Sequence, residues 1–202
     1  MSRIVLATRN QGKIEELRRI LDGIEVVGLD AFPDAPEVPE TELTFAGNAL
    51  LKARAIAAHT GLPAVSDDSG LCVDALNGMP GVLSARWSGR FGVQAGDRDR
   101  ANLDLVLDQL ADVEDGARGA HFFCAAALVV PGHAEHVVDG RMYGTILRAP
   151  RGTGGFGYDP IFLPDGETRS SAELTPAEKD AISHRGRAFR ALAEIIPTAV
   201  SA

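Results

Sequence analysis

The chain has 202 residues, 45% of them hydrophobic, which is enough to bury a core as one domain or as one domain with two lobes. Its formal net charge of −8 argues against a nucleic-acid or anionic-membrane partner, whereas a small phosphorylated ligand needs only local positive charge. The longest strongly apolar run, residues 122–130, is too short to span a bilayer, and the first residues lead into a strand rather than a signal peptide. We therefore expect a cytoplasmic protein. Cys72 and Cys124 lack metal-ligand spacing and are expected to be buried apolar residues.

The first third of the chain is predicted to alternate strands with helices. Residues 4–8 have the apolar character of a buried strand, and the turn at 9–12 leads into an amphipathic helix. The apolar face of that helix is predicted to consist of Ile14, Leu17, Ile20 and Leu21. The following segments are predicted to be a strand at 26–27, an irregular acidic loop at 30–42, a helix at 44–58 and a short strand at 64–66.

The remainder is predicted to supply antiparallel strands and three helices. We expect a helix at 97–110, strands at 120–130, 136–142 and 145–147, and an irregular glycine-rich segment at 151–160. Thr175-Pro176-Ala177-Glu178 predicts the start of a short helix that carries Lys179. The last helix is predicted to follow Ser183 and to pack through Phe189, Leu192 and Ile196. These elements indicate an α/β fold with a mixed central sheet flanked by helices.

Positive charge is divided unevenly between its two main carriers. Only three lysines, Lys13, Lys52 and Lys179, stand against seventeen arginines, and a lysine is a compact point charge on a flexible stem. Lys13 follows Thr8-x-Asn10-x-x, where a strand end meets a helix start and backbone N–H groups favour an anion. Many structural turns share this pattern, so it is a weak signal by itself.

Two adjacent carboxylates, Asp67 and Asp68, are predicted to lie just beyond the end of the third strand, the usual side for ligands in open α/β sheets. Mg²⁺ on a phosphate substrate needs only one or two protein carboxylates, and Glu40 in the acidic loop is a candidate for the second. The alternative is that Asp67 or Asp68 is a turn residue bonded to its own backbone.

The glycine-rich segment centres on Phe156, whose flanking glycines leave its ring open for stacking on a base. Asp159 is near enough in sequence to accept a hydrogen bond from the base edge. The alternative is that Phe156 and Tyr158 pack into the core. Ser183-His184-Arg185 has a similar alternative, a helix cap with a salt-bridged arginine. A serine-hydrolase site is not supported, because the chain has no Gly-x-Ser-x-Gly motif.

Taken together, five motifs resemble those of the inosine/xanthosine triphosphate pyrophosphatase family, also described as XTP/dITP diphosphatases. The motifs are Thr8-x-Asn10-x-x-Lys13, Asn48-x-x-x-Lys52-Ala53, Ser66-Asp67-Asp68-Ser69-Gly70-Leu71, Gly154-Gly155-Phe156-Gly157-Tyr158-Asp159-Pro160 and Ser183-His184-Arg185-Gly186. They run through nearly the whole chain in family order, and all three lysines fall on motif positions.

The resemblance implies a single domain, residues 1–202, whose two lobes enclose a nucleotide cleft. It also implies a homodimeric, Mg²⁺-dependent enzyme that hydrolyses ITP, dITP and XTP to the monophosphate and pyrophosphate and so cleanses the nucleotide pool. Asp68 would bind the metal, with Glu40 as its partner ligand, and would accept the proton of water. The residues that would hold the triphosphate are Thr8, Arg9, Asn10, Gln11, Gly12, Lys13, Lys52 and Ser69. Those that would hold the nucleoside are Phe156, Gly157, Tyr158, Asp159, Lys179, His184 and Arg185.

The chemistry of the bases fits this assignment. A 6-oxo purine offers an acceptor where adenine offers a donor, so donors from His184 or Arg185 would favour hypoxanthine over adenine. Two rivals stay open. One is a septum-type nucleotide pyrophosphatase of related fold that acts on modified pyrimidines, and the other is a regulatory module that binds nucleotides without chemistry.

Overall fold

The structure of the protein is a computed structural model that describes residues 3–9, 11–20 and 24–200. The predictions for Asn10 and Leu21 lie outside the described residues. Residues 11, 12 and 17 are described in their backbone only, so the predictions for their side chains are also outside the described part.

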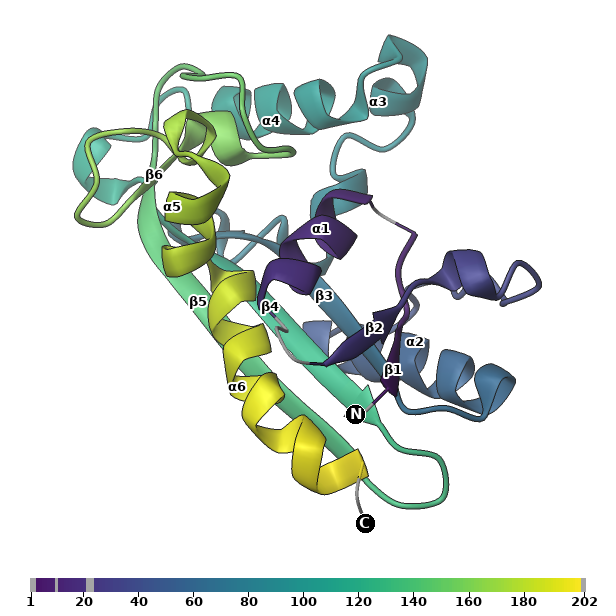
Figure 1. The fold of residues 1–202 in the computed structure, drawn as a ribbon. Helices are drawn as coiled ribbons and strands as arrows, with labels where there is room; N and C mark the ends of the chain where they lie inside the picture. The colour runs from purple at the N-terminus through teal and green to yellow at the C-terminus, as the bar shows by residue number, and fades with distance from the viewer. Residues whose placement is uncertain (1–2, 10, 21–23, 201–202) are drawn as a thin grey trace. The chain divides into compact units, whose positions relative to one another are not determined.

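The strands form a six-stranded mixed sheet in the order β2-β1-β3-β4-β5-β6 (Figure 1). Their bounds are β1 Arg3–Leu6, β2 Glu25–Val27, β3 Ala64–Val73, β4 Gly119–Val129, β5 Glu135–Ile146 and β6 Phe162–Pro164. β1 pairs in parallel with β2 and β3, with Val5 opposite both Val27 and Ala64, whereas β5 and β6 are antiparallel. The predicted mixed α/β class is therefore confirmed.

The helices are α1 Gln11–Ile20, α2 Phe45–Thr60, α3 Arg90–Ala95, α4 Arg98–Gln109, α5 Pro176–Ile182 and α6 His184–Val200. All were predicted within a few residues except the short helix α3. Local chemistry sets their ends: the Thr44 hydroxyl accepts from Gly47 N at 3.0 Å at the start of α2, and Gly61 ends it with φ 69°. Asp97 caps α4 by accepting from Arg100 N.

Two strand predictions were wrong in length. β3 does not stop at Ser66 but continues through Asp67-Asp68-Ser69-Gly70 to Val73, so the two carboxylates lie inside a strand rather than in a turn beyond it. β5 is one strand, where a break at 143–144 was expected. In both places tertiary pairing overrides a local sequence that is typical of turns.

The chain divides into two compact units. Unit 1 comprises residues 1–68, 124–140 and 183–202, and unit 2 comprises residues 69–123 and 141–182. The expectation that both form one domain around a cleft stays a prediction.

In unit 1 the sheet is covered on both faces. Ile4, Leu6 and Val65 pack in one core cluster with Ile14 of α1 and with Phe189, Leu192 and Ile196 of α6. Because side chains alternate along a strand, Val5 and Ala64, which are also buried, point to the opposite face. Figure 1 shows α1 and α6 on one side of these strands and α2 on the other. The predicted packing face of α6 is confirmed.

Unit 2 has its own core, in which residues from β3, β4 and β5 pack against α4 and the segment after β5. Leu71, Phe122, Met142, Leu103 and Phe162 belong to this cluster. Gly70 allows β3 to approach the turn at 81–86 closely, since a Cβ there would lie 2.5 Å from the Gly81 carbonyl oxygen.

Cys72 and Cys124 are buried free thiols, as predicted.

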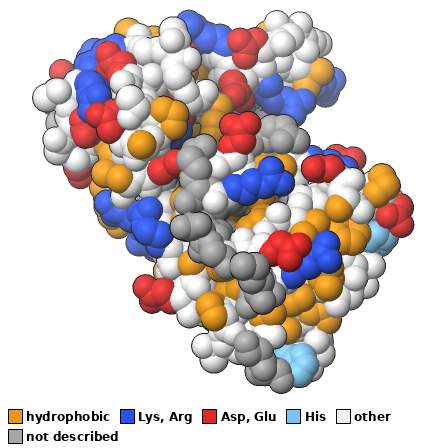
Figure 2. Space-filling model, viewed as in Figure 1, with side chains coloured by type: hydrophobic (Ala, Val, Ile, Leu, Met, Phe, Trp, Pro, Cys, Tyr) orange, Lys and Arg blue, Asp and Glu red, His pale blue; other side chains and the backbone are white. Residues whose placement is uncertain are grey.

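No helix in the described ranges is both long enough and apolar enough to cross a membrane. On the face shown in Figure 2, acidic and basic side chains are interspersed rather than separated by sign.

Gly140 of β5 offers a test of the packing in unit 1. A Cβ at this position would lie 2.2 Å from the His184 carbonyl oxygen and 2.7 Å from Ala188 N, so Gly140→Ala pushes α6 away from the strand. We expect a loss of about 1–3 kcal/mol in the free energy of unfolding, measured by urea denaturation. Gly116→Ala is the matched control, because a Cβ there meets no atom within 4 Å. Equal stability of the two variants would contradict this account of α6.

Candidate active site

Asp67 and Asp68 lie at neighbouring positions of β3, and both are buried. Successive side chains of a strand point to opposite faces of the sheet, so the two carboxylates contact different elements. Asp67 contacts α1 and α6, whereas Asp68 contacts α2. One short stretch of strand therefore places an acid on each face.

Asp67 is a buried carboxylate with two cationic partners. Its Oδ2 accepts from Lys13 Nζ at 2.9 Å, and Arg185 Nε lies 3.4 Å from the same oxygen. Burial by itself would raise the pKa of Asp67, but the charges of Lys13, Arg185 and Lys52 outweigh burial and hold the pKa well below its ordinary value. Asp67 is therefore a fixed anion.

Asp68 has a different environment. Its Oδ2 accepts from Asn48 Nδ2 at 2.9 Å, and its Oδ1 lies 3.9 Å from Lys52 Nζ. Burial raises the pKa of Asp68 above its ordinary value, and the nearby charge of Glu40 adds to the increase, while Lys52 and Asn48 oppose it. Asp68 thus holds a proton more readily than Asp67.

Lys52 joins Asp68 to the acidic loop. Its Nζ lies 2.7 Å from Glu40 Oε1, and the charges of Asp67, Asp68 and Glu40 raise its pKa although burial works against the charged form. The structure therefore brings together the two carboxylates that were predicted to bind metal, with one ammonium between them.

This pair of carboxylates is suited to a hard divalent cation. Among the described residues, no group of three or more His, Cys, Asp and Glu side chains is arranged to hold a metal ion. Mg²⁺, however, needs only one or two protein carboxylates when waters and substrate phosphates supply the remaining ligands. Glu40 and Asp68 fit that requirement.

The segment between β1 and α1 has a defined main chain at Thr8 and Arg9. The Arg9 guanidinium donates to the Ala35 carbonyl at 3.0 Å, which ties the segment to the acidic loop. Ser69 is half-buried and directly follows Asp68 in β3. Contacts of Thr8, Arg9 and Ser69 with phosphates stay predictions.

The residues predicted to bind the base lie largely in unit 2. Phe156 is 42% exposed, and Lys179 Nζ lies 5.0 Å from the centre of its ring. Asp159 is buried, and its Oδ2 accepts from Phe156 N at 2.9 Å and from Lys179 Nζ. Phe156, Asp159 and Lys179 therefore form one cluster, with Asp159 holding the backbone of the segment.

Tyr158 packs into the core, which was the alternative to base binding. Its ring belongs to the core cluster of unit 2, and its hydroxyl donates to the Ser84 carbonyl at 2.8 Å. Burial raises the pKa of this hydroxyl. A predicted contact between Tyr158 and substrate would therefore involve its main chain.

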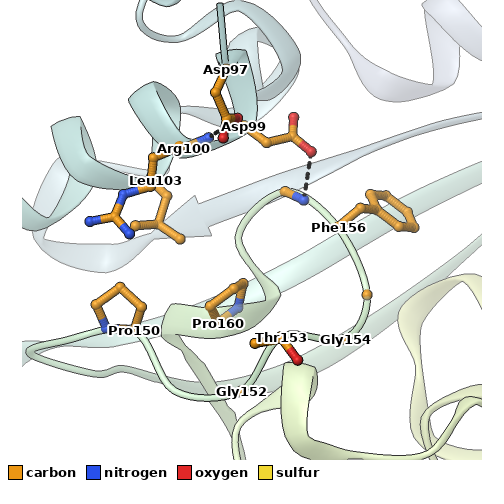
Figure 3. A pocket seen from close by; sticks show the side chains of 12 residues that line it. Asp97, Asp99, Arg100, Leu103, Pro150, Gly152, Thr153, Gly154, Phe156 and Pro160 are labelled. Atoms are coloured by element: carbon orange, nitrogen blue, oxygen red, sulfur yellow. Dashed lines mark hydrogen bonds between the residues drawn. The ribbon is translucent and has the colours of Figure 1, made fainter. Parts of the chain in front are cut away.

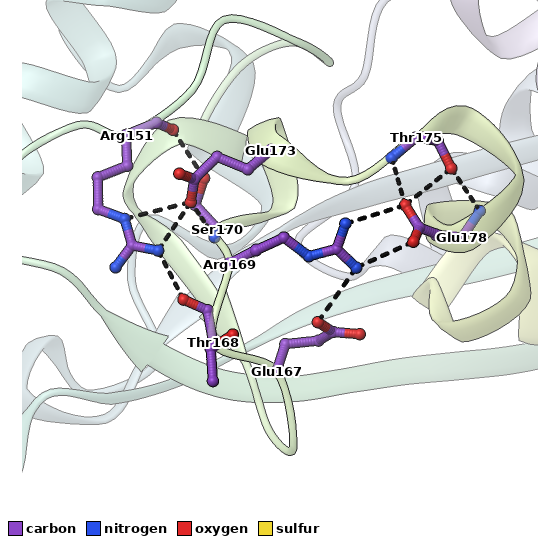
Figure 4. Close-up of polar contacts among 8 residues, drawn as sticks. All are labelled: Arg151, Glu167, Thr168, Arg169, Ser170, Glu173, Thr175 and Glu178. Carbon is purple, nitrogen blue, oxygen red and sulfur yellow. Dashed lines mark hydrogen bonds and ion pairs between the residues drawn. The ribbon is translucent and has the colours of Figure 1, made fainter.

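Figure 4 shows two ion-pair networks among residues 151–178 of unit 2. Arg151 donates to Glu173 Oε2 at 2.8 Å and to the Thr168 carbonyl at 2.6 Å.

Glu178 accepts from Thr175 N at 2.8 Å and donates its own N–H to the Thr175 hydroxyl at 3.3 Å, which confirms the predicted capping box at the start of α5. Hydrogen bonds from Arg169 and Thr175 lower the pKa of Glu178 to about 2. The start of α5, the helix that carries Lys179, is thus anchored at Thr175, the residue before the helix.

His184 and Arg185 begin α6 in unit 1 and are both buried. Ser183 accepts from Gly186 N at 2.9 Å, so the helix-cap alternative is correct for Ser183. Arg185 is also salt-bridged, as that alternative predicted, and its partner is Asp67, which the sequence did not indicate. Donation from His184 or Arg185 to a base stays a prediction.

Sequence reasoning named Asn48 only as part of a motif, without a role, and it missed Asp99. Asn48 is fully buried and holds Asp68, and its Oδ1 also accepts from Glu42 N. Its spacing of four from Lys52 indicated that both lie on one helix face, but it did not indicate the contact with Asp68. Asp99, whose Oδ2 accepts from Gly157 N at 2.9 Å, resembles any acid in the first turn of a helix and gave no such signal.

A mixed α/β sheet that places lysines and carboxylates beside a strand-to-helix turn is typical of a phosphate-binding protein. The comparisons with known proteins identify the class more closely. The Ham1 family model matches residues 4–195, and the chain belongs to this family.

Relatives with established names are similar over nearly their whole length. The dITP/XTP pyrophosphatase of Streptomyces coelicolor is 62% identical over 200 residues, which cover 97% of this chain and 98% of that protein. The dITP/XTP pyrophosphatase of Frankia alni is 61% identical, with 96% of each chain covered. Among solved structures, a HAM1 protein from Coxiella burnetii matches with a TM-score of 0.87 and 42% identity, over 98% of this chain and 100% of that one. These matches confirm the family resemblance and the fold.

Proposed function

We propose that this protein hydrolyses deaminated purine nucleoside triphosphates, namely ITP, dITP and XTP, to the nucleoside monophosphate and pyrophosphate. The observation that carries the proposal is the cluster in unit 1, in which Lys13 and Lys52 each face one of two adjacent carboxylates. The names of the Streptomyces and Frankia relatives support the choice of substrate. Hydrolysis of these nucleotides would keep deaminated bases out of the nucleotide pool.

The proposal gives the two acids different tasks. Asp67 is compensated by Lys13 and Arg185, so it has little affinity for a proton and serves to hold the two cations in place. Asp68 accepts from the side-chain amide of Asn48, and the Lys52 ammonium is farther away, at 3.9 Å. Because Glu40 adds negative charge nearby, Asp68 keeps a higher affinity for a proton or a cation than Asp67. This difference supports Asp68 as the acceptor of the proton from the attacking water.

Mg²⁺ is proposed as the cofactor, held by Asp68 and Glu40. The chemistry that it supplies when bound is charge neutralisation on the phosphates and a lower pKa of water. The protein's own contribution is the pair of lysines: Lys13 and Lys52 offer rotatable N–H donors that can turn from carboxylate to phosphate oxygens and offset the charge of the departing pyrophosphate.

The base is proposed to bind at the glycine-rich segment, where the exposed ring of Phe156 offers a stacking face. Donors from His184 and Arg185 are proposed to read the 6-oxo group. A site that hydrogen-bonds this oxygen rejects adenine, because the buried donors would be left unpaired. The homodimer expected from the resemblance and the cytoplasmic location expected from the sequence stay predictions. Sedimentation of the purified protein in an analytical ultracentrifuge tests the first.

The reaction itself is the first test of this function. With Mg²⁺, ITP and XTP are expected to yield monophosphate and pyrophosphate in steady-state assays that include GTP, ATP and modified pyrimidine triphosphates. Chelation by EDTA should abolish turnover. Orthophosphate as the primary product would place the attack at the terminal phosphorus and refute the proposal. Preference for modified pyrimidines would favour the septum-type alternative, and binding without any product would favour the regulatory module.

Asp68→Asn tests the assignment of the proton acceptor. The substitution keeps the shape and the contact with Asn48 while it removes basicity and metal affinity, so kcat should fall by at least about a hundredfold. KM should change less. Asp67→Asn is the matched variant on the opposite face of the strand. Near-normal turnover in Asp68→Asn together with its loss in Asp67→Asn would reverse the two assignments.

Selectivity for the base separates Phe156 from Arg185. Phe156→Ala removes a stacking contact that any base can use, worth about 1–3 kcal/mol, and should weaken ITP and ATP alike. Arg185→Ala should reduce kcat/KM for ITP more than for ATP, because a charged hydrogen bond to the 6-oxo group is worth roughly 1.5–3 kcal/mol. Since Arg185 also contacts Asp67, the diagnostic quantity is the ITP to ATP ratio of kcat/KM rather than either rate alone. An unchanged ratio in Arg185→Ala would remove Arg185 from base recognition.

A further inference from the structure

We infer that Asp99, an exposed acid on α4, is a positioning residue that holds the glycine-rich segment in the conformation in which Phe156 receives the base. This inference rests on the proposed function for the role of Phe156. It adds a residue that lies outside all five motifs of the family resemblance.

The backbone of the segment is held from three directions. Gly154 N donates to the Ala172 carbonyl at 3.0 Å, Phe156 N to Asp159 Oδ2 at 2.9 Å, and Gly157 N to Asp99 Oδ2 at 2.9 Å. The first two acceptors belong to residues 159–172, close to the segment in sequence. Asp99 comes from a different helix, 58 residues away in sequence, and fixes the segment relative to α4.

These hydrogen bonds are important because glycines flank Phe156. Gly155 and Gly157, on either side of Phe156, both have left-handed backbones, with φ of 70° and 61°. Glycine reaches other regions of φ and ψ at little cost, so the local sequence does not select this conformation strongly. The orientation of the Phe156 ring therefore depends on the acceptors that hold the neighbouring N–H groups, together with Lys179, whose Nζ lies 5.0 Å from the centre of the ring.

Packing does not replace the hydrogen bond from Gly157 to Asp99. A cavity of about 230 Å³ lies between the first turns of α4 and the segment, lined by Asp99, Leu103, Gly154, Phe156 and Pro160 among others (Figure 3). Figure 3 shows the Asp99 carboxylate at the edge of this space, bonded to the N–H of the segment. Because this space is not filled by side chains, we expect loss of this bond to leave the segment room to move toward α4.

The direction in which KM changes when Asp99 is removed distinguishes a positioning role from a purely electrostatic one. Asp99 is an anion, so its removal in a purely electrostatic role would strengthen binding of a polyanionic nucleotide and lower KM. Loss of a positioning contact would instead raise KM and leave kcat nearly unchanged, because stacking on Phe156 contributes equally to bound substrate and transition state.

The test compares three variants on the same helix. Asp99→Ala removes the acceptor, Asp99→Asn keeps an acceptor oxygen without the charge, and Asp108→Ala removes an exposed acid near the other end of α4. In Asp99→Ala, the KM for ITP should rise about three- to tenfold with kcat within about twofold, which is the scale of one hydrogen bond. Asp99→Asn should restore KM to within about twofold, and Asp108→Ala should leave it unchanged.

A second readout does not depend on turnover. Amide hydrogen exchange of Gly157, followed by NMR in the ligand-free protein, should accelerate in Asp99→Ala and return toward the original rate in Asp99→Asn. An unchanged or lower KM in Asp99→Ala, or an unchanged exchange rate at Gly157, overturns the inference. Failure of the unaltered protein to release pyrophosphate from any triphosphate refutes the proposed function instead, and the exchange rates then still decide whether Asp99 holds the segment.

Discussion

The burial of Asp67 in the middle of β3 is the constraint on which the organisation of unit 1 depends. A buried carboxylate without partners costs several kcal/mol, so the strand is stable only with cations at hand. Lys13 and Arg185 supply them, and both come from the first turn of their helices, α1 and α6. One anion thereby ties a strand to the starts of two helices, whose N-terminal dipoles also favour negative charge. The same requirement brings basic groups to a place where a phosphate can use them.

The pleat of β3 separates structure from chemistry. Asp67 and Asp68 are adjacent in sequence, yet they face different helices and differ in the direction of their pKa shifts. A turn at this point, as the sequence suggested, would have left both acids solvated and alike. Placement within a strand gives each acid its own face of the sheet. Asp67 can therefore stay charged while Asp68, the next residue, has a higher proton affinity.

Local sequence was sufficient for most helices, because caps such as Thr44, Asp97 and Thr175 and their apolar stripes are short-range signals. It was insufficient where distant partners decide the outcome. Asp-Asp-Ser-Gly is typical of a turn, but here it continues β3. Within this strand the buried Asp67 is compensated by Lys13, 54 residues away, and Arg185, 118 residues away. The candidate residues came from motif order, whereas the pairing of Arg185 with Asp67 and the role of Asn48 required the fold.

The scarcity of lysine has a physical explanation in these contacts. Each of the three lysines pairs with a carboxylate at a candidate binding position: Lys13 with Asp67, Lys52 with Glu40 and Lys179 with Asp159. These pairs compensate charge when no ligand is bound, so partly buried ammonium groups carry no large penalty. An ammonium on a flexible stem can rotate its three donors to a new oxygen, whereas the donors of an arginine guanidinium all lie in one rigid plane. Under the proposed function, ligand binding then exchanges one anionic partner for another instead of creating new charge pairs. Arginine serves where the geometry stays fixed, as in the pairs of Arg151 with Glu173 and Arg169 with Glu178.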